Sequence, residues 1–235
     1  MQAVILAGGL GKRLGDLTKH VPKAMVPIAG KPFLHHVIQL LKRNGIVDIV
    51  ICIGYLGWRV KEFFGDGETM GINIKYSEEG DKLLGTGGAL KQAQNMLADY
   101  FLVLNGDTYL PVNYGELERE FLKLGKKALM VVYNNEDDTG VKNNVALDDA
   151  LRVARFDKEH VSPELKYVEA GAIMLRREVL DLIQAGIPIS LEEGVYQHLI
   201  ERKEMAAFIS PQRFYDIGTP GQQAVFEQFI RKGAI

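Results

Sequence analysis

Residues 3–15 read AVILAGGLGKRLG, an apolar run that gives way abruptly to glycine and then to positive charge. The run VILA, at 4–7, has the length and composition of a buried β-strand. It is followed by three glycines and two cations: Gly8, Gly9, Gly11, Lys12 and Arg13. Glycine lets a bulky group approach the backbone closely, and a strand that ends in such a turn presents its N–H groups as an anion nest. The ligand of this turn is therefore expected to be an anion.

Two familiar phosphate-binding loops do not fit the turn. A P-loop requires G-x-x-x-x-G-K-[ST], but Leu6 stands at its first glycine and Arg13 at its Ser/Thr position. A dinucleotide-binding G-x-G-x-x-G fails at its third glycine, which is Leu14 here. The glycines, the adjacent cations and Lys23 downstream still favour a polyphosphate site, because arginine and backbone amides both bind phosphate oxygens.

Strands and helices alternate as far as residue 133. The expected strands are 4–7, 46–54, 72–77, 100–107 and 127–133. The expected helices are 32–45, 57–65, 86–97 and 114–124. Several of these strands are apolar throughout, which is typical of a mostly parallel sheet covered by helices on both faces. This α/β pattern predicts a doubly wound sheet of the nucleotide-binding kind.

The rhythm changes in the second half of the chain. β-like segments follow one another at 145–149, 151–157 and 167–175 without a long helix between them, so this half is expected to be more antiparallel. Helices are expected again at 176–186, 190–203 and 224–233, with a strand at 206–210. We expect one domain, 1–235, with a nucleotide-binding lobe at 1–133 and a smaller lobe at 134–235.

Composition excludes several classes of function. The chain has 235 residues, a formal net charge of −2 and a pI near 6.2, so it is not expected to bind nucleic acid or an anionic membrane. The apolar stretch AVILA is too short for a signal peptide or a membrane span, and a cytoplasmic location is expected. The single cysteine, Cys52, lies in an apolar run and is expected to be a buried, inert thiol.

Five blocks of sequence, in this order, resemble the signature of the sugar-1-phosphate nucleotidyltransferases. They are LAGGLGKRL (6–14), PKAMVPIAGKP (22–32), LGTGGAL (84–90), LNGDTYL (104–110) and YDIGTP (215–220). The resemblance runs almost the length of the chain. It implies a Rossmann-like, doubly wound, mixed and mostly parallel sheet, helices on both faces, and a small antiparallel sugar-side lobe.

The resemblance also implies an activity. The family joins a nucleoside triphosphate to a sugar 1-phosphate and releases pyrophosphate, with Mg²⁺ as cofactor. At the matching positions, the resemblance implies that Arg13 and Lys23 are catalytic and that Asp107 and Asp216 bind the metal ion. The nucleotide would be bound by Leu6, Ala7, Gly8, Gly9, Gly11, Lys12, Gly85, Thr86, Gly87, Asn105 and Gly106. The sugar phosphate would be bound by Lys158, Lys166, Glu169, Gly171 and Thr219.

Several details stay open at this point. Many relatives carry F-x-E-K, whereas this chain has FDKE at 156–159, which leaves both Lys158 and Lys166 as candidates for the sugar phosphate. LGTGGAL is expected to face the base with its main chain, with Thr86 capping the following helix. EEGDK, at 78–82, is expected to be a solvated turn.

The blocks most resemble the heptose- or mannose-1-phosphate guanylyltransferases. A thymidylyl- or uridylyltransferase acting on glucose 1-phosphate is the alternative within the family. A catalytically inactive nucleotide-sugar-binding subunit is the alternative of another class, although retention of Arg13, Lys23, Asp107 and Asp216 favours the enzyme. A homodimer is the expected assembly.

Overall fold

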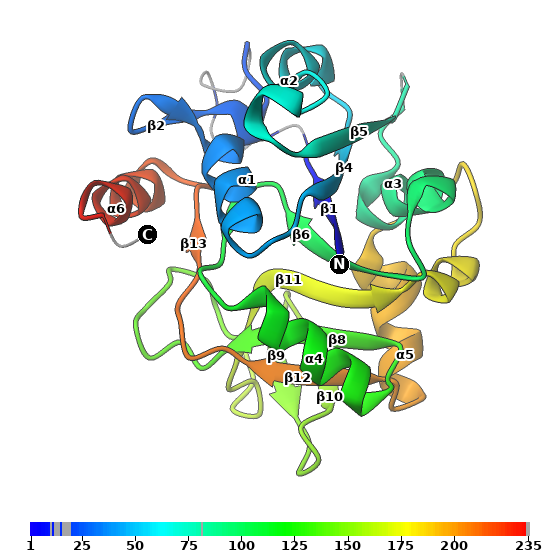
Figure 1. Ribbon diagram of the computed structural model, residues 1–235. Coiled ribbons are helices and arrows are strands. Elements are labelled where there is room, and N and C mark those ends of the chain that lie inside the picture. The colour runs from blue at the N-terminus through cyan, green and yellow to red at the C-terminus, as the bar shows by residue number, and fades with distance from the viewer. Residues whose placement is uncertain (10, 12–14, 16–19, 81, 234–235) are drawn as a thin grey trace.

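Seven strands form one central sheet in the computed structural model, which describes residues 1–9, 11, 15, 20–80 and 82–233 (Figure 1). The order across the sheet is β12-β8-β11-β6-β1-β4-β5, and β11 alone among these runs against the others. The strands are β1 (Gln2–Leu6), β4 (Asp48–Ile53), β5 (Asn73–Glu78), β6 (Tyr100–Asn105), β8 (Ala128–Tyr133), β11 (Val168–Arg176) and β12 (Met205–Ile209). The predicted mixed, mostly parallel sheet is confirmed.

Three small antiparallel pairs flank the sheet: β2 (Pro27–Ile28) with β3 (Lys31–Pro32), β7 (Thr108–Tyr109) with β13 (Tyr215–Asp216), and β9 (Val145–Leu147) with β10 (Val153–Phe156). The α-helices are α1 (Phe33–Arg43), α2 (Gly57–Phe64), α3 (Gly85–Ala93), α4 (Tyr114–Leu124), α5 (Gln197–Glu201) and α6 (Pro220–Arg231). Shorter turns are η2 (Lys23–Met25), η3 (Glu68–Met70), η4 (Gln94–Met96), η5 (Arg177–Leu182) and the π-helical η6 (Glu192–Tyr196).

Alternation along the strands divides the core between the two faces of the sheet. In β1, Ala3 and Ile5 pack with α1, α2, α4 and α6 on one face, while Val4 packs with α3, η5, η6 and α5 on the other. Since successive side chains of a strand point to opposite faces, a strand buried on both faces must be apolar throughout. Helices therefore cover both faces, as predicted, and Cys52 is buried in the second core.

The second half of the chain joins the same sheet instead of forming a separate one. β11 inserts between β6 and β8, and β12 extends the sheet beyond β8. The predicted helix at 176–186 is wrong in type, because residues 177–182 form the 3₁₀ turn η5. The segment 190–203 contains one π turn before the short helix α5.

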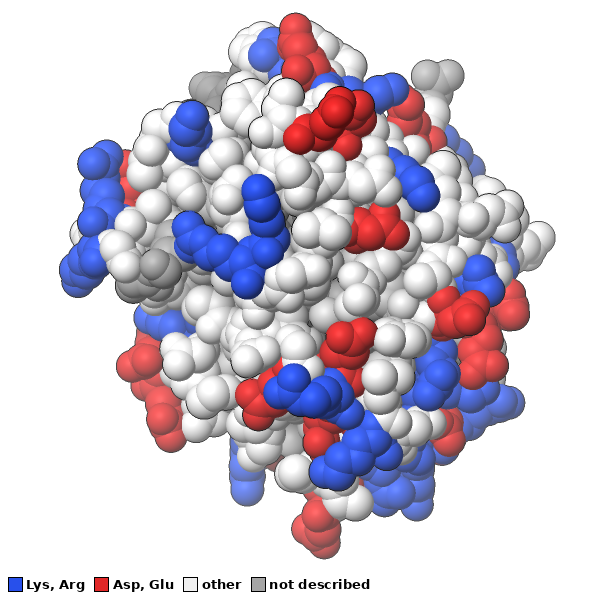
Figure 2. All heavy atoms as spheres, in the orientation of Figure 1, with Lys and Arg blue, Asp and Glu red and all other residues white. Residues whose placement is uncertain are grey.

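The surface carries charge of both signs. Figure 2 shows Lys and Arg interspersed with Asp and Glu over the face in view. Within the described part of the chain, no helix is both long and apolar enough to span a membrane.

The order of the strands creates a switch point between β1 and β6. From β1 the chain moves outward through α1, β4, α2 and β5, and then returns through α3 to β6 on the other side of β1. Ligands of open α/β sheets bind at the carboxyl ends of the two strands beside such a point. Here those ends are Leu6 and Asn105, which are paired in register.

Gly106 makes the close approach at this point possible. Its N–H donates to the carbonyl oxygen of Leu6 at 2.9 Å, and a Cβ added at Gly106 would lie 2.5 Å from that oxygen. A side chain here would force the ends of β1 and β6 apart.

Substituting Gly106→Ala should therefore lower the free energy of unfolding by about 1–3 kcal/mol, the usual cost of overpacking. Gly221→Ala is the matched control, because nothing lies within 4 Å of its added Cβ in α6. The control should be neutral or more stable by roughly 0.5 kcal/mol, since alanine favours helix. Urea unfolding followed by circular dichroism measures both. Equal stabilities for the two variants would contradict the crowding at Gly106.

Candidate active site

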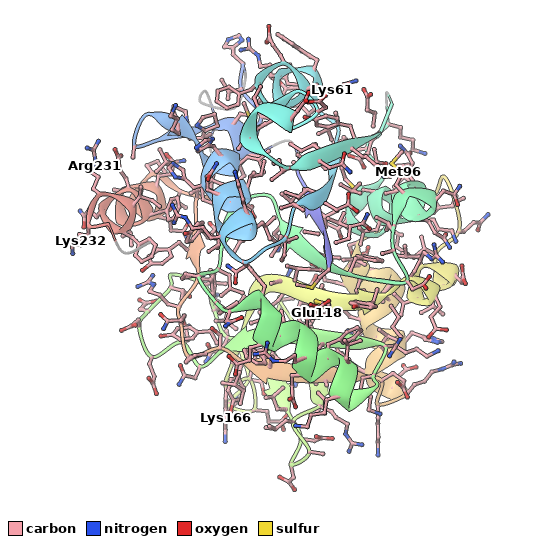
Figure 3. All side chains as sticks on the ribbon, in the orientation of Figure 1. Lys61, Met96, Glu118, Lys166, Arg231 and Lys232 are labelled. Atoms are coloured by element: carbon pink, nitrogen blue, oxygen red, sulfur yellow. The ribbon has the colours of Figure 1, made fainter. Side chains whose placement is uncertain are left out.

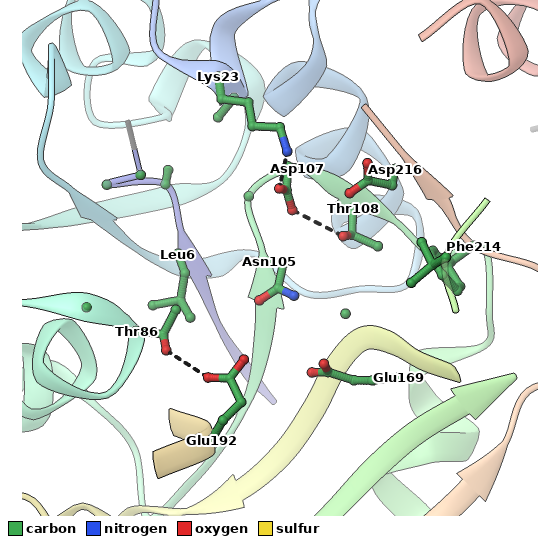
Figure 4. A pocket seen from close by; sticks show the side chains of 18 of the residues that line it. Leu6, Lys23, Thr86, Asn105, Asp107, Thr108, Glu169, Glu192, Phe214 and Asp216 are labelled. Atoms are coloured by element: carbon green, nitrogen blue, oxygen red, sulfur yellow. Dashed lines mark hydrogen bonds and ion pairs between the residues drawn. The ribbon is translucent and has the colours of Figure 1, made fainter. Parts of the chain in front are cut away.

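One cavity of about 790 Å³ opens at the carboxyl ends of β1 and β6 (Figure 4). Most residues singled out from the sequence line it, although they come from segments far apart in the chain. They are Leu6, Ala7, Gly8, Gly9, Lys23, Gly85, Thr86, Asn105, Gly106, Asp107, Lys158, Glu169, Gly171, Asp216 and Thr219.

Three of the predicted residues that the structure describes, Gly11, Gly87 and Lys166, do not line the cavity. Lys12 and Arg13 lie outside the described residues. Gly11 has a φ of 61°. Lys166 is an exposed side chain on the segment before β11, and Figure 3 shows it at the edge of the molecule, pointing outward. Of the two candidate lysines, Lys158 lines the cavity and Lys166 does not.

The turn after β1 is shaped by a buried carboxylate. A Cβ added at Gly8 would lie 2.2 Å from Oε2 of Glu79, and one at Gly54 would lie 2.7 Å from the same atom. The backbone of this turn is fixed to β4, because the amide of Ala7 donates to the carbonyl oxygen of Cys52 at 2.8 Å. A side chain at Gly8 would therefore have to displace Oε2 of Glu79.

The expectation that EEGDK is a solvated turn is wrong for Glu79. This side chain is 5% exposed, lines the cavity, and accepts a hydrogen bond from the amide of Leu84 at 2.8 Å on Oε1. Burial raises the pKa of Glu79, and the bond from Leu84 opposes that rise. Its neighbour Glu78 is exposed and pairs with Lys61. The charged sequence gave no sign that one of the two acids is buried by the fold.

Two aspartates distant in sequence are brought together by a short antiparallel ladder. Asp107 follows β6, and β7 then pairs with β13 so that Asp216 lies opposite Thr108. The amide of Ile217 donates to the carbonyl oxygen of Asp107 at 3.2 Å, which fixes the two segments to each other. Figure 4 shows both carboxylates in the same part of the cavity.

The helix α6 supports this arrangement from behind. Phe226 is fully buried, and its ring packs against those of Phe33, Tyr109 and Tyr215. Because β13 leads directly into α6, this aromatic cluster holds Asp216 in place.

Lys23 provides the positive charge beside Asp107. It begins the turn η2, and its Nζ donates to Oδ2 of Asp107 (Figure 4). The other oxygen of Asp107 accepts from the hydroxyl of Thr108 at 3.2 Å, and Oδ1 of Asp216 accepts from the amide of Gly218 at 2.5 Å. Among the described residues, no three acidic, histidine or cysteine side chains cluster as a complete metal site. Two carboxylates suit an ion that takes its other ligands from phosphate and water, as Mg²⁺ does.

Two amides at the start of α3 are already bonded within the chain. The amides of Gly87 and Gly88 donate to the carbonyl oxygen of Ile189 at 3.0 and 3.2 Å, so neither is available to a base. A Cβ at Gly85 or Gly87 would meet the backbone of 189–190 at 2.7 and 3.0 Å. These glycines let α3 pack closely against the segment 189–190.

Thr86 also departs from prediction. The helix begins at Gly85, and Thr86 does not cap it. Its hydroxyl accepts from the amide of Leu191 at 2.8 Å and lies 3.5 Å from Oε2 of Glu192 (Figure 4). Thr86 therefore joins the start of α3 to the second half of the chain.

The other end of the cavity holds a lysine between two carboxylates. Nζ of Lys158 lies 3.3 Å from Oε2 of Glu169 and 2.6 Å from Oε1 of Glu192. Tyr196 donates to Glu169 at 3.3 Å, and the buried Asn144 accepts the amide of Glu169 at 2.9 Å. Burial alone would lower the pKa of Lys158, but the two acids outweigh it and raise that pKa. Burial raises the pKa of Glu169, partly offset by Lys158.

A bulge in β11 completes this wall. The pairing of β11 with β8 shifts between Glu169 and Ile173, and Gly171 there has a φ of 71°. A Cβ at Gly171 would lie 2.7 Å from Thr108. Glycine is thus needed at this position for both its backbone conformation and its contact with the β7 segment.

Sequence reasoning missed several lining residues: Glu79, Lys142, Asn144, Glu192 and Gln222. They lie outside the five recognisable blocks. Asn144 and Glu192 act through partners distant in sequence, and no local pattern marks them.

Comparison with known proteins agrees with this geometry. Residues 2–231 match the nucleotidyl transferase family. The chain is 34% identical over 220 residues to the D-glycero-α-D-manno-heptose 1-phosphate guanylyltransferase of Campylobacter jejuni, covering 94% of this chain and 96% of that protein. It is 30% identical over 237 residues to a mannose-1-phosphate guanylyltransferase of Mycobacterium tuberculosis, covering all of this chain but only 64% of that protein.

A solved structure is similar over nearly the whole fold. The crystal structure of HddC from Yersinia pseudotuberculosis, complexed with GMP-PN, superposes with a TM-score of 0.81 at 25% identity, covering 97% of this chain and 99% of that one. The motifs, the fold and these relatives agree, and the chain belongs to the nucleotidyl transferase family of enzymes.

Proposed function

We propose that this enzyme transfers a guanylyl group from GTP to a heptose or mannose 1-phosphate, giving a nucleotide sugar and pyrophosphate. The observation that carries the proposal is the meeting of Lys23, Asp107 and Asp216 in the cavity that also holds the glycine turn. The relatives named as heptose- and mannose-1-phosphate guanylyltransferases support this choice of substrates.

The chemistry requires no general base. An oxygen of the sugar phosphate, already anionic at neutral pH, attacks the α-phosphorus, and the bond to the β-phosphate oxygen breaks with its electrons leaving on pyrophosphate. The protein must hold two mutually repelling anions in line and neutralise the charge that develops. Lys23 is placed for that task beside Asp107, and the amides of the turn at Gly8 and Gly9 would bind the triphosphate.

A Mg²⁺ ion would be held by Asp107 and Asp216. When bound, it supplies charge neutralisation to the reacting phosphates and helps to align them. Both carboxylates line the cavity and are tied together through the β7–β13 ladder, so they suit this ion without a third acidic ligand.

The carboxylate of Glu79 favours guanine over uracil and thymine as the bound base. An ionised carboxylate only accepts hydrogen bonds. Guanine presents two adjacent donors, N1–H and the N2 amino group, whereas uracil and thymine present one donor between two carbonyl oxygens that a carboxylate repels. Glu79 lines the cavity beside Gly8 and the start of α3. This arrangement favours GTP over UTP and dTTP as the nucleotide substrate.

Replacing Glu79→Gln should therefore reduce the preference for GTP. The amide keeps one acceptor but turns the other into a donor, so the ratio of kcat/KM for GTP to that for UTP or dTTP should fall by about tenfold to 100-fold. Pyrophosphate release with each nucleotide at a fixed concentration of mannose 1-phosphate measures this ratio.

Glu78→Gln is the matched control, because Glu78 is the adjacent acid and pairs with Lys61 at the surface. It should keep the wild-type preference. An unchanged ratio in the Glu79 variant, or a wild-type enzyme that prefers UTP or dTTP, would argue against guanine recognition at Glu79.

Replacing Asp107→Asn should lower kcat by about 100-fold or more, because the metal ion and Lys23 would both lose a charged partner. The fold should remain intact, since this side chain is part of the cavity wall and not of the core. Pyrophosphate release under saturating Mg²⁺ gives kcat, and circular dichroism checks the fold. Asp99→Asn, at an exposed carboxylate paired with Arg177, is the control and should keep wild-type turnover. Turnover at the wild-type rate in Asp107→Asn would remove this residue from the metal site.

A further inference from the structure

The cavity is lined by three lysines within the described part of the chain: Lys23, Lys142 and Lys158. Lys23 is paired with Asp107, and Lys158 with both Glu169 and Glu192. Lys142 is exposed and makes no ion pair with any described carboxylate. Among the described residues, its positive charge therefore has no acidic partner at the wall of a cavity that must hold anions.

Lys158 is poorly suited to bind an incoming phosphate. Its ammonium lies within 3.3 Å of Glu169 and 2.6 Å of Glu192, so the three groups together carry a net negative charge. A phosphate approaching Lys158 would meet two carboxylates, or would have to displace the lysine from them. Removing Lys158 from these acids would also leave Glu169, with a side chain only 9% exposed, without its cation.

The loop that carries Lys142 is held in shape by its own hydrogen bonds. Asn135, with a φ of 61°, accepts from the amide and hydroxyl of Thr139 at 3.1 and 2.7 Å. Its amide group donates to the carbonyl oxygen of Val141 at 3.0 Å and to Oδ1 of Asn143 at 3.1 Å. Lys142 thus projects from a loop whose backbone is ordered on both sides of it.

This loop lies against the segment that carries the second aspartate. The backbone carbonyl oxygen of Asp138 accepts from the guanidinium of Arg213, just before β13, at 3.4 Å. A Cβ at Gly140 would lie 3.6 Å from Nε2 of Gln222 in α6. Gly140, Lys142, Thr219 and Gln222 line the cavity together with Asp216. For in-line attack, the sugar phosphate must lie beside the α-phosphate. Lys142 lines the cavity together with Asp216, which would help to hold the metal ion.

We propose that Lys142 binds the 1-phosphate of the sugar substrate, and that Lys158 is a positioning residue that holds Glu169 for the sugar hydroxyls. The inference rests on the proposed transfer to a sugar 1-phosphate, although not on which base or sugar is used. The two lysines then have different roles. Lys142 binds the sugar phosphate, and Lys158 keeps Glu169 and Glu192 in place.

The test compares the KM for mannose 1-phosphate in Lys142→Gln, Lys142→Arg, Lys158→Gln and Lys166→Gln, with saturating GTP and Mg²⁺. Lys142→Gln should raise this KM by about tenfold or more, while the KM for GTP changes by less than about twofold. Lys142→Arg should restore it to within about threefold, because the charge is kept. Lys166→Gln, at an exposed lysine outside the cavity, should match the wild type.

The salt dependence of the KM for mannose 1-phosphate distinguishes the role of Lys142 from that of Lys158. The rise in KM for mannose 1-phosphate with added NaCl should be weaker in Lys142→Gln than in the wild type, because one unpaired charge is gone. Lys158→Gln should keep the wild-type salt dependence but lose discrimination between mannose and glucose 1-phosphates. A wild-type KM and salt dependence in Lys142→Gln would overturn the proposal, as would a flattened salt dependence in Lys158→Gln alone.

A binding experiment distinguishes failure of this inference from failure of the proposed function. If the wild-type chain turns over no sugar 1-phosphate with any nucleotide, the proposed function fails. Calorimetric titration with inorganic phosphate still tests Lys142, since this probe carries the anion without the sugar. Lys142→Gln should then bind phosphate about fivefold more weakly than Lys166→Gln. Equal affinities would overturn the role of Lys142.

Discussion

The close approach of β1 and β6 at their carboxyl ends is the constraint on which the site depends. Gly106 lies against the carbonyl oxygen of Leu6, where no side chain fits. This contact places the glycine turn after β1 beside Asp107, which follows β6 directly. The β7–β13 ladder then adds Asp216, and η2 adds Lys23. Separation of the two strand ends would disperse all of these groups.

The electrostatics of the cavity follow from what it must hold. Its described lining carries three lysines and five carboxylates, an excess of acidic over basic side chains. A divalent ion held by Asp107 and Asp216, as proposed, would offset this excess beside Lys23. Under the same proposal, Glu79 would accept hydrogen bonds from a base and Glu169 from a sugar. Cationic and acidic groups would then serve different parts of the substrates.

The sequence was sufficient for the mixed, mostly parallel sheet and for most of the described residues that were expected to line the cavity at its centre. Apolar strands alternating with helices predicted the fold, and the blocks around Asp107 and Asp216 predicted that these residues share a cavity. Burial of Glu79 could not be predicted, because it depends on the amide of Leu84 and on the absence of a side chain at Gly8. For the same reason the glycines of α3 suggested a base-binding loop, although the fold commits two of their amides to Ile189. The local sequence gives the chemical type of a residue, but the fold determines which residues it contacts.

The segment 187–191 connects two walls of the cavity. Ile189 is hydrogen-bonded to the start of α3 in both directions, and Leu191 is bonded to Thr86. The next residue, Glu192, contacts the lysine of the sugar end. A few peptide bonds therefore link the start of α3 to Glu192 and, through it, to Lys158. A shift of α3 that keeps these hydrogen bonds would also have to move Glu192, so the main chain couples these two walls of the cavity mechanically.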